Sequence, residues 1–373
     1  MPDHARLAAL TADFAVSHAH FLQTIVPLWQ GPGWNPALEL PYEAVDALQQ
    51  PLPVQHYRAM ACARQLYVFA RHIDQPGARE RATALFRSLQ RHFHDTEHGG
   101  WYYSVDAHGK PLDRRKDLYT HAFIVFACAH YSAKTTEPLI VSTLEAALNL
   151  VAARFSTSDG LYEACLAEDW STLQSRPLQN PLMHLAEAFL ATLQVRQDPG
   201  IQQALLDLCA AMQARFVDPG SSVMLEKPLG AVDNWFEPGH QFEWFFLLES
   251  SALMRGGSLH RSLAKAFSHA EACGVRDGAV VSMLNVDGSV RDATQRVWAQ
   301  AEYLRALTML PDGRERVAQQ LDVLRQQFLH PLGWYECRDS GGQVSRSDMP
   351  STTPYHLDTC YQGLQAYLGV SQP

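Results

Sequence analysis

The chain has 373 residues, 47% of them hydrophobic, which is enough to bury a sizeable core. Its formal net charge of -9, with no run rich in Lys or Arg, excludes the electrostatic surface that nucleic acids or anionic membranes require. No stretch approaches the roughly 18 to 20 uninterrupted apolar residues of a membrane span, and the N-terminal segment carries charges where a signal peptide needs an apolar core. We therefore expect a soluble cytoplasmic protein with no nucleic-acid or membrane partner.

Seven cysteines are scattered through the chain without a C-x-x-C pair, and several fall in apolar runs such as FIVFACAHY. An odd, widely spaced set is not typical of a disulfide framework. We interpret all seven as buried thiols in a reducing cytoplasm.

Amphipathic helical periodicity returns in segment after segment, and most segments end in a short stretch rich in Gly, Asp and Pro. In chain order, the pattern predicts twelve helices, near residues 4–28, 54–72, 78–94, 116–133, 136–155, 180–195, 199–216, 238–255, 258–273, 292–309, 313–329 and 354–369.

Between alternate helices, a short aromatic or branched pattern that begins at a small residue keeps returning. It reads GWYYS from Gly100, GLYEA from Gly160, SVMLE from Ser222, GAVVS from Gly278 and GWYEC from Gly333, so that successive starts are 60, 62, 56 and 55 residues apart. This spacing indicates a diverged repeat of one helix pair plus one hairpin-like connection, in which neighbouring repeats bury one another's apolar faces. The segment GPGWNPALELPYEAVDALQQPLPV supplies a sixth, less regular connection.

Six helix pairs can extend as an open solenoid or close on themselves. Neither end of the chain has an obvious polar capping repeat, and the final helix is as apolar as the internal ones, so closure is favoured. The prediction is an all-α protein, an (α/α)6 barrel that forms a single domain over residues 1–373. The inner helices of such a barrel converge, and the long connections at one end form a funnel where a ligand can bind.

Four predicted inner helices carry a histidine or a carboxylate among apolar residues near their start. The four stretches are QNPLMHLAEAFL with Asn180 and His184, EPGHQFEWFFLL with His240 and Glu243, RVWAQAEYLRAL with Trp298 and Glu302, and PSTTPYHLDTCYQGL with His356. A single histidine in an apolar helix is usually a satisfied core residue. In a closed barrel, however, all three histidines face one axial cavity, and the cost of burying several titratable groups together indicates an active site.

A metal site is an alternative, because histidine and glutamate are good ligands. Neither an H-E-x-x-H motif on one helix nor a pair of E-x-x-H motifs is present, so we predict no catalytic metal. The absence of a G-x-S-x-G elbow, a P-loop and a G-x-G-x-x-G loop argues against nucleophilic and nucleotide chemistry. We therefore expect no cofactor.

Proton transfer is the chemistry that these residue types favour, because imidazoles that titrate near 6.5 act as acid or base at neutral pH. Trp298, Trp244 or Trp29 would suit the apolar face of a sugar ring. Arg64, in AMACARQLYVFA, is a cation in an otherwise apolar helix face, and is either an ion-paired residue or part of the site.

The segments NPLMHLAEAFL, EPGHQFEWFFLL, RVWAQAEYL and TPYHLDTCY, in this order and spacing, resemble the N-acylglucosamine 2-epimerase superfamily, which includes mannose isomerases and cellobiose 2-epimerases. The resemblance runs from about Arg64 to His356, and P-G-H-x-x-E-W is its most specific element. It implies an (α/α)6 barrel, in agreement with the repeat, and sugar chemistry at C2 without a metal or redox cofactor.

The resemblance also implies roles for individual residues. His240 and His356 match the two histidines that exchange a proton with the substrate carbon, one from each side, and His184 matches a third that assists ring opening or moves protons between sugar oxygens. Glu243 would orient or polarise His240, and Arg64 would bind the sugar oxygens and stabilise the enediolate. Four further residues would line the substrate pocket: Asn180, Trp298, Glu302 and, as a weaker match in KDLYTHAF, Tyr119.

The compact connections of this chain suit a free monosaccharide. The resemblance therefore favours interconversion of D-mannose and D-fructose, by a monomer or homodimer, and the alternative is 2-epimerisation of a free or N-acylated hexose. A carbohydrate-binding module and a glycoside hydrolase stay open, although no second acid facing Glu243 or Glu302 is evident for hydrolysis. Two positions depart from the family pattern: Leu182 stands where many members have a histidine, and Met60 stands where an aromatic residue is expected.

Overall fold

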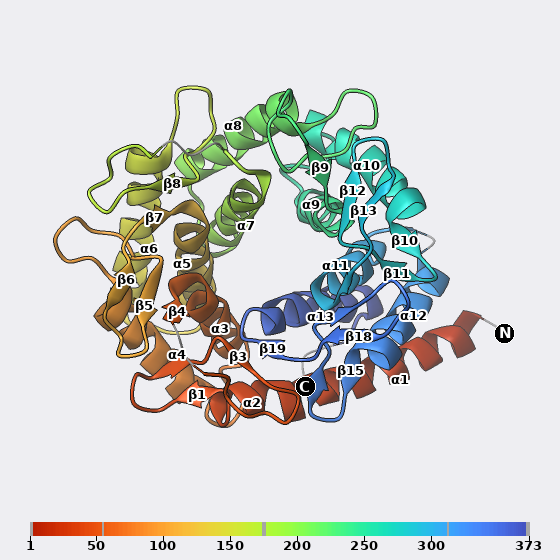
Figure 1. The fold of residues 1–373 in the computed structure, drawn as a ribbon, viewed down its shortest axis with the longest axis horizontal. Helices are drawn as coiled ribbons and strands as arrows, with labels where there is room; N and C mark the ends of the chain where they lie inside the picture. The colour runs from red at the N-terminus through yellow and green to blue at the C-terminus, as the bar shows by residue number, and fades with distance from the viewer. Residues whose placement is uncertain (1–2, 54–55, 174–176, 312, 371–373) are drawn as a thin grey trace.

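Two concentric rings of helices form an (α/α)6 barrel in the computed structural model, which describes residues 3–53, 56–173, 177–311 and 313–370 (Figure 1). The inner ring consists of α3 (Ala59–Arg71), α5 (Leu118–Ser132), α7 (Gln179–Val195), α9 (Pro238–Ser250), α11 (Val297–Leu307) and α13 (Thr353–Leu368). The outer ring consists of α1 (Asp3–His20) with η1 (Phe21–Ile25) and α2 (Val26–Gln30), α4 (Ala78–Ser88) with η2 (Leu89–Phe93), α6 (Pro138–Leu150) with η3 (Val151–Phe155), α8 (Pro199–Phe216), α10 (Ser258–Gly274), and α12 (Arg314–Val323) with η4 (Leu324–Phe328). The predicted fold is confirmed.

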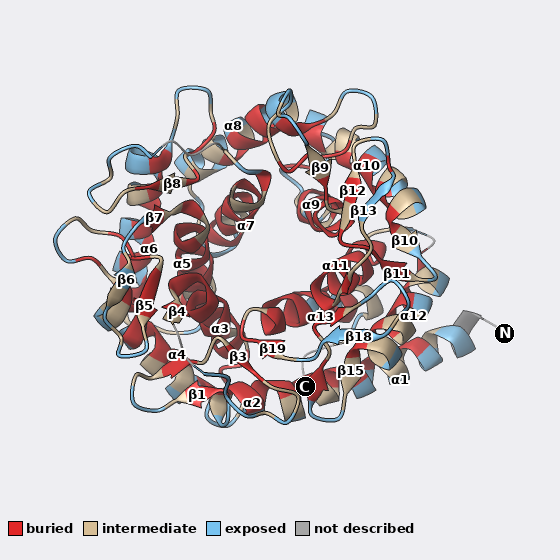
Figure 2. Ribbon diagram, in the orientation of Figure 1, coloured by how far each residue is buried: buried red, intermediate tan, exposed pale blue. Residues whose placement is uncertain are grey.

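The two rings differ in how their helices are buried (Figure 2). Nearly every side chain of α5 is buried, in keeping with its apolar sequence LYTHAFIVFACAHYS. In α4, by contrast, one stripe that includes Ala82, Leu85 and Phe86 is buried while the charged residues face outward. A helix that is apolar on nearly all sides belongs in the interior and an amphipathic one on the surface, so the sequences of α5 and α4 fit their rings.

Short strands hold the connections between helices. In chain order they are β1 (Trp34–Asn35), β2 (Leu40–Pro41), β3 (Ala44–Val45), β4 (His56–Arg58), β5 (Ser104–Asp106), β6 (Pro111–Asp113), β7 (Lys116–Asp117), β8 (Cys165–Leu166), β9 (Trp235–Phe236), β10 (Val275–Arg276), β11 (Ala279–Val280), β12 (Met283–Asn285), β13 (Val290–Asp292), β14 (Gln295–Arg296), β15 (Leu329–His330), β16 (Gly333–Trp334), β17 (Cys337–Arg338), β18 (Val344–Arg346) and β19 (Met349–Pro350). All pairings are antiparallel, and the sheets are β1-β2, β10-β11, β13-β12-β9, β14-β17-β18, β15-β16, β19-β3, β4-β5-β6 and β7-β8.

One pairing rule recurs around the ring. The strand that leads into an inner helix pairs with a strand in the connection after the outer helix of the same pair, as β4 does with β5, β7 with β8, β9 with β12 and β14 with β17. The last inner helix, α13, has no outer helix after it, and its leading strand β19 pairs instead with β3, which follows α1 and α2. The outer helix α1 with α2 therefore completes the helix pair of α13, and the pairing of β19 with β3 closes the barrel.

The predicted repeat marks the hairpin after each outer helix. All five starting residues have a positive φ, from 65° at Ser222 to 153° at Gly333. A left-handed backbone is easiest for glycine, which explains why four of the five are glycines. The sixth connection, through β1 to β3, is present and less regular.

Two predicted helices begin five residues later than expected, the largest differences among the helix starts. The helix predicted at 54–72 begins at Ala59, because His56–Arg58 form β4, and residues 54–55 lie outside the described residues. The helix predicted at 292–309 begins at Val297, because β14 immediately precedes it. In both places the residues before the helix pair with a distant strand, which local periodicity does not report.

All seven cysteines lie within the described residues and none forms a disulfide. Five are buried as predicted, whereas Cys165 and Cys273 are only partly buried. Among the described helices, one stretch, Pro138–Phe155, has the length and mean hydropathy (1.3) of a membrane-crossing helix, and 39% of it is buried in the barrel wall.

Candidate active site

The N-terminal ends of the inner helices converge on a cavity of about 120 Å³. Eight of the nine residues predicted for the site line this cavity: Arg64, Tyr119, Asn180, His184, His240, Glu243, Trp298 and His356. They come from all six inner helices, most of them from the first turn or two. The repeat places these positions at the same level of the barrel, so residues more than 290 positions apart in the chain, such as Arg64 and His356, share one wall.

His240 is the third residue of α9, and a carboxylate that the sequence analysis missed holds its ring. Its Nδ1 lies 2.7 Å from Oε1 of Glu226, which is buried in the connection after α8. Nδ1 therefore donates to Glu226, and Nε2 is left for the cavity. Burial lowers the pKa of His240, but the charges of Glu226 and Glu237 outweigh it and raise this pKa to about 9, so the ring is an imidazolium at neutral pH.

The carboxylate of Glu226 is itself held in place. Gln179 Nε2 donates to its two oxygens over 3.1 and 3.0 Å, while Gln179 Oε1 accepts from Trp244 Nε1 over 2.9 Å. Because the indole only donates, it fixes which end of the amide faces Glu226. Trp244 is thus fully buried behind the site and Trp29 lies in the core, so neither forms the predicted aromatic wall of the cavity.

His356, in the first turn of α13, is held in the same manner by Glu302 of α11. Its Nδ1 lies 2.7 Å from Glu302 Oε1, and both side chains are buried. Burial lowers the pKa of His356 well below its usual value, and the nearby Arg64 and His184 lower it further. His356 is therefore neutral at neutral pH, with Nε2 free to accept a proton.

Trp298 lies beside both rings. Its centroid is 5.1 Å from that of His240 and 5.5 Å from that of His356. Gly239 allows this approach, since a Cβ there would lie 2.7 Å from the indole. The indole forms the aromatic wall, as predicted.

His184 belongs to a third hydrogen-bonded group. Its Nδ1 donates to Glu187 Oε2 over 3.0 Å, and the same oxygen accepts from the Tyr355 hydroxyl. Burial lowers the pKa of His184 to about 4, although the hydrogen bond and the charge of Glu187 oppose this. His184 is thus also neutral at neutral pH.

Arg64 provides the positive charge of the cavity. Its Nη2 donates to the Tyr119 hydroxyl over 2.8 Å, and its guanidinium lies 4.4 Å from the centroid of Phe123 and 4.8 Å from that of Tyr355. No ion pair joins Arg64 to a carboxylate in the described part of the chain. A buried cation without a counter-ion favours a ligand on which negative charge develops.

Two carboxylates lie elsewhere than predicted. Glu243 does not hold His240; its oxygens have no hydrogen-bond partner among the described residues, and the nearest imidazole is His184, whose Nδ1 is 3.9 Å away. Burial and the charges of Glu302 and Glu187 raise the pKa of Glu243 well above its usual value, which favours its neutral form. Glu302 does not line the cavity, because it lies behind His356.

The remaining predictions concern three uncharged residues. Asn180 lines the cavity, and its Oδ1 atom is buried without a hydrogen-bond partner among the described residues. Leu182 and Met60, which depart from the family pattern, are both buried outside the lining of the cavity.

Several lining residues were not predicted: Glu237, Arg296, Glu336, Thr352 and Thr353. Glu226 and Glu336 share a signal that the sequence contains, since each follows a repeat start by three or four residues, in SVMLE and GWYEC. The hairpins thus carry acids to the same end of the barrel as the helix starts.

Three groups of side chains at the cavity have the residue types of a metal site. They are Glu226, Glu237 and His240; His184, Glu187 and Glu243; and Glu243, Glu302 and His356, with the candidate ligand atoms of each group within 4.8 Å of one another. Carboxylate and imidazole sets of this kind suit divalent transition metals. The metal-free site therefore stays a prediction, which chelation tests.

Comparison with known proteins shows the class of enzyme to which the chain is similar. Two solved structures share its fold: a cellobiose 2-epimerase from Spirochaeta thermophila (TM-score 0.85, 21% identity, 96% of this chain and 98% of the other) and a D-mannose isomerase (TM-score 0.82, 19% identity, 94% and 98%). A mannose-6-phosphate isomerase from Rhizobium meliloti is 29% identical over 89% of this chain and 91% of the relative. The protein is an enzyme of the sugar isomerase and epimerase type.

A match to a protein-family model identifies the family within this class. The model for N-acylglucosamine 2-epimerase matches residues 42–360, and the chain belongs to this family. This membership bears out the resemblance and favours an isomerase over the hydrolase and binding-module alternatives.

Proposed function

We propose that the enzyme interconverts D-mannose and D-fructose as free monosaccharides. The observation that carries the proposal is a pair of histidines in one small cavity, each held by a buried carboxylate, whose pKa values shift in opposite directions. His240 is an imidazolium held by Glu226, and His356 is a neutral imidazole held by Glu302. An acid and a base beside one aromatic wall suit proton transfer at a carbon next to a carbonyl group.

The proposed reaction starts from the open-chain aldose. Nε2 of His356 removes the proton from C2, while His240 gives a proton to the carbonyl oxygen O1, and a cis-enediol forms. His356 then returns its proton to C1, and the O2 proton passes to His240, which leaves the ketose and both histidines in their starting states. The reaction needs no redox partner, because each proton returns to the substrate or the enzyme.

Arg64 and Asn180 support the charged intermediate in this proposal. The Arg64 guanidinium stabilises negative charge on the enediolate oxygens, and Asn180 Oδ1 accepts from a sugar hydroxyl. His184, neutral and hydrogen-bonded to Glu187, assists ring opening. A cavity of about 120 Å³ suits one hexose ring better than a disaccharide.

The second candidate is epimerisation at C2. It is favoured by the imidazolium at His240, which would return a proton to C2 from the face opposite His356. Which product forms depends on whether C1 or C2 of the enediol receives the proton.

Product analysis separates the two candidates. Chelator-treated enzyme is incubated with D-mannose, D-fructose, D-glucose, N-acetylmannosamine or mannose 6-phosphate, and the products are followed by NMR. The proposal predicts mannose and fructose as the interconverting pair. Glucose from mannose, or N-acetylglucosamine from N-acetylmannosamine, would identify an epimerase, and loss of turnover on chelation would overturn the metal-free mechanism.

Substitution of the two histidines tests their roles. His240→Asn and His356→Asn should each lower kcat by about 10² to 10⁴-fold, the usual contribution of a general acid or base. His108→Asn, in an exposed turn, is the control and should leave kcat unchanged. Full activity in either active-site variant would remove that histidine from the mechanism.

A further inference from the structure

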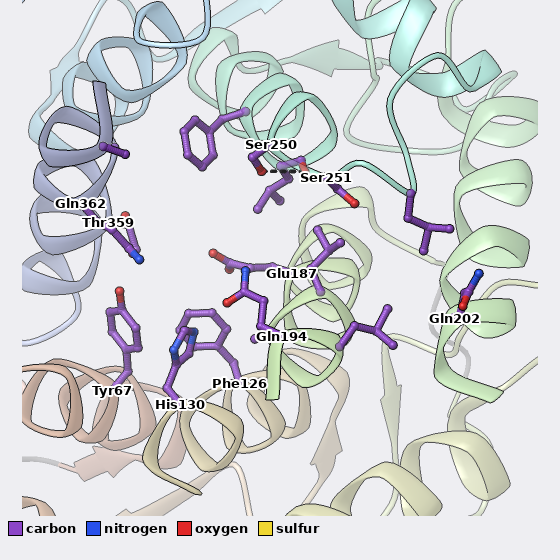
Figure 3. A pocket seen from close by; sticks show the side chains of 18 of the residues that line it. Tyr67, Phe126, His130, Glu187, Gln194, Gln202, Ser250, Ser251, Thr359 and Gln362 are labelled. Atoms are coloured by element: carbon purple, nitrogen blue, oxygen red, sulfur yellow. Dashed lines mark hydrogen bonds between the residues drawn. The ribbon is translucent and has the colours of Figure 1, made fainter. Parts of the chain in front are cut away.

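A second cavity, larger than the one at the candidate active site, lies at the other end of the barrel. It has a volume of about 540 Å³ and is enclosed by the C-terminal halves of all six inner helices (Figure 3). None of its lining residues lines the candidate active site. Volumes of this size are typical of sites for small molecules.

The floor of this rear cavity is formed by buried polar side chains. Arg305 is 6% exposed, and its Nε has no hydrogen-bond partner among the described residues. Tyr67 is 1% exposed, and no described residue hydrogen-bonds to its hydroxyl, which points into the space beside Thr359 (Figure 3). Glu187 extends its carboxylate into the same space (Figure 3). The Tyr67 hydroxyl and Arg305 Nε lack partners among the described residues, and a buried polar group without a partner is costly, so a ligand with hydroxyl groups would be favoured here.

The walls and the mouth add the other elements of sugar recognition. Phe126 and Phe246 give apolar surface, and Arg305 lies 3.9 Å from the centroid of Phe246. Near the mouth, the exposed amides of Gln194 and Gln362 project toward the cavity (Figure 3). Aromatic faces combined with amides and hydroxyls suit the two surfaces of a polyhydroxylated ring.

The charge of the cavity disfavours anions. The C-terminal ends of the inner helices carry partial negative charge and converge here. Arg305 is offset by its ion pair with Glu302, at 3.3 Å, and by Glu187. His130 adds no charge, because burial lowers its pKa to about 4.

We propose that the rear cavity is a second binding site, for an uncharged polyhydroxylated molecule of monosaccharide to disaccharide size. Ligand binding in the rear cavity does not depend on which reaction the candidate active site catalyses. The floor also contacts the candidate active site, because Glu187 Oε2 accepts from His184 and Arg305 pairs with the carboxylate that holds His356. A bound molecule at Glu187 should therefore be detectable at the His184 ring.

The probe for this site is trehalose, a non-reducing disaccharide without a free carbonyl group that is too large for the cavity of about 120 Å³. Binding is measured by calorimetry and by the ¹⁵N shifts of the imidazoles, and a second titration uses sorbitol. We expect saturable 1:1 binding of trehalose, with a shift of the His184 resonance.

A variant whose cavity mouth is filled by two tryptophans, the plugged variant, tests whether trehalose binds in the rear cavity. Ser250→Trp with Ala366→Trp fills the mouth from two exposed positions and should weaken trehalose binding at least about tenfold, that is by about 1.4 kcal/mol. The control carries the same pair of changes on the outer helix α6, Ser142→Trp with Ala146→Trp, and should bind as the parent does. Circular dichroism establishes that both variants are folded.

Three outcomes would overturn the proposal. They are no saturable binding of trehalose or sorbitol, equal binding by the folded plugged variant, and tighter binding of trehalose 6-phosphate than of trehalose, which would indicate an anion site. Because turnover of mannose is measured separately, failure here leaves the proposed function untouched, and the converse also holds.

Discussion

At the scale of single residues, the protonation of each candidate histidine follows from burial and from the charges around it. Burial lowers the pKa of His240, but the charges of Glu226 and Glu237 outweigh it and raise this pKa to about 9, whereas burial lowers the pKa of His356 well below 6.5 and nearby Arg64 and His184 lower it further. The acid is therefore charged and the base neutral over a common range. We predict a bell-shaped pH profile of kcat/KM, with a fall below the pKa of His356 and a fall above about 9 as His240 loses its proton.

Glu226→Gln tests the origin of the alkaline limb. The amide removes the negative charge 2.7 Å from His240, so the pKa of His240 should fall and the alkaline limb should move to lower pH. Glu145→Gln, on an exposed face of α6, is the control and should keep the parent profile. If the limb of Glu226→Gln stays in place while kcat falls, Glu226 has only a structural role.

The sequence reveals the histidines more readily than their partners. His184, His240 and His356 stand near helix starts in apolar runs, so helical periodicity alone places them at one level. Glu226 lies in a connection 14 residues before His240, and no periodicity relates the two. The resemblance implies that Glu243 orients His240, but Glu226 of the adjoining hairpin occupies that position, and Glu243 has no hydrogen-bond partner among the described residues.

At the scale of elements, α9 and α11 fit closely at Gly239. A methyl group at this position would lie 2.7 Å from the indole of Trp298 and 3.0 Å from Ala299 Cβ. Gly239→Ala should displace Trp298 and raise KM severalfold, with a loss of stability of about 1 to 3 kcal/mol from overpacking. Gly341→Ala, in an open turn, is the control for both measurements. An unchanged KM would show that the position of Trp298 does not affect substrate binding.

Secondary-structure elements are predictable from the sequence where they depend on the local pattern of apolar and polar residues. Each predicted helix is present, because each depends on a local pattern: α4 is amphipathic, for example, and α5 is apolar on nearly all sides. The strands that precede α3 and α11 were missed, since two or three residues form a strand only by pairing with a distant segment. Local periodicity contains no information about such a partner.

At the scale of the whole molecule, closure depends on contacts between the first and last segments. Besides β19 and β3, buried Asp358 of α13 contacts two groups at the end of α3: His72 Nε2 at 2.7 Å and Arg71 Nε at 3.3 Å. Burial raises the pKa of Asp358, but His72 and Arg71 outweigh it and lower the pKa overall. This stabilisation is therefore present above the unfolded-state pKa near 3.9 and is lost as the pH falls through the lower folded-state value.

Asp358→Asn should lower the free energy of unfolding by about 3 to 5 kcal/mol at neutral pH, as expected when one partner of a buried ion pair is removed. The difference from the parent protein should shrink on acidification. Urea unfolding at several pH values measures both effects, with Asp74→Asn, whose side chain is 91% exposed, as the control. Equal stability of Asp358→Asn and the parent at neutral pH would remove this cluster from the closure of the barrel.

The most direct test of the central claim is deuterium exchange. Chelator-treated enzyme is incubated with D-mannose in deuterated water, and the sugars are analysed by NMR for deuterium at C1 and C2. Because the proton that His356 takes from C2 can exchange with solvent before it is returned, proton transfer through an enediol predicts fructose with some deuterium at C1 and, through the reverse reaction, mannose with some deuterium at C2, both suppressed in folded His356→Asn. Deuterium that enters both sugars at the parent rate in His356→Asn would contradict the account.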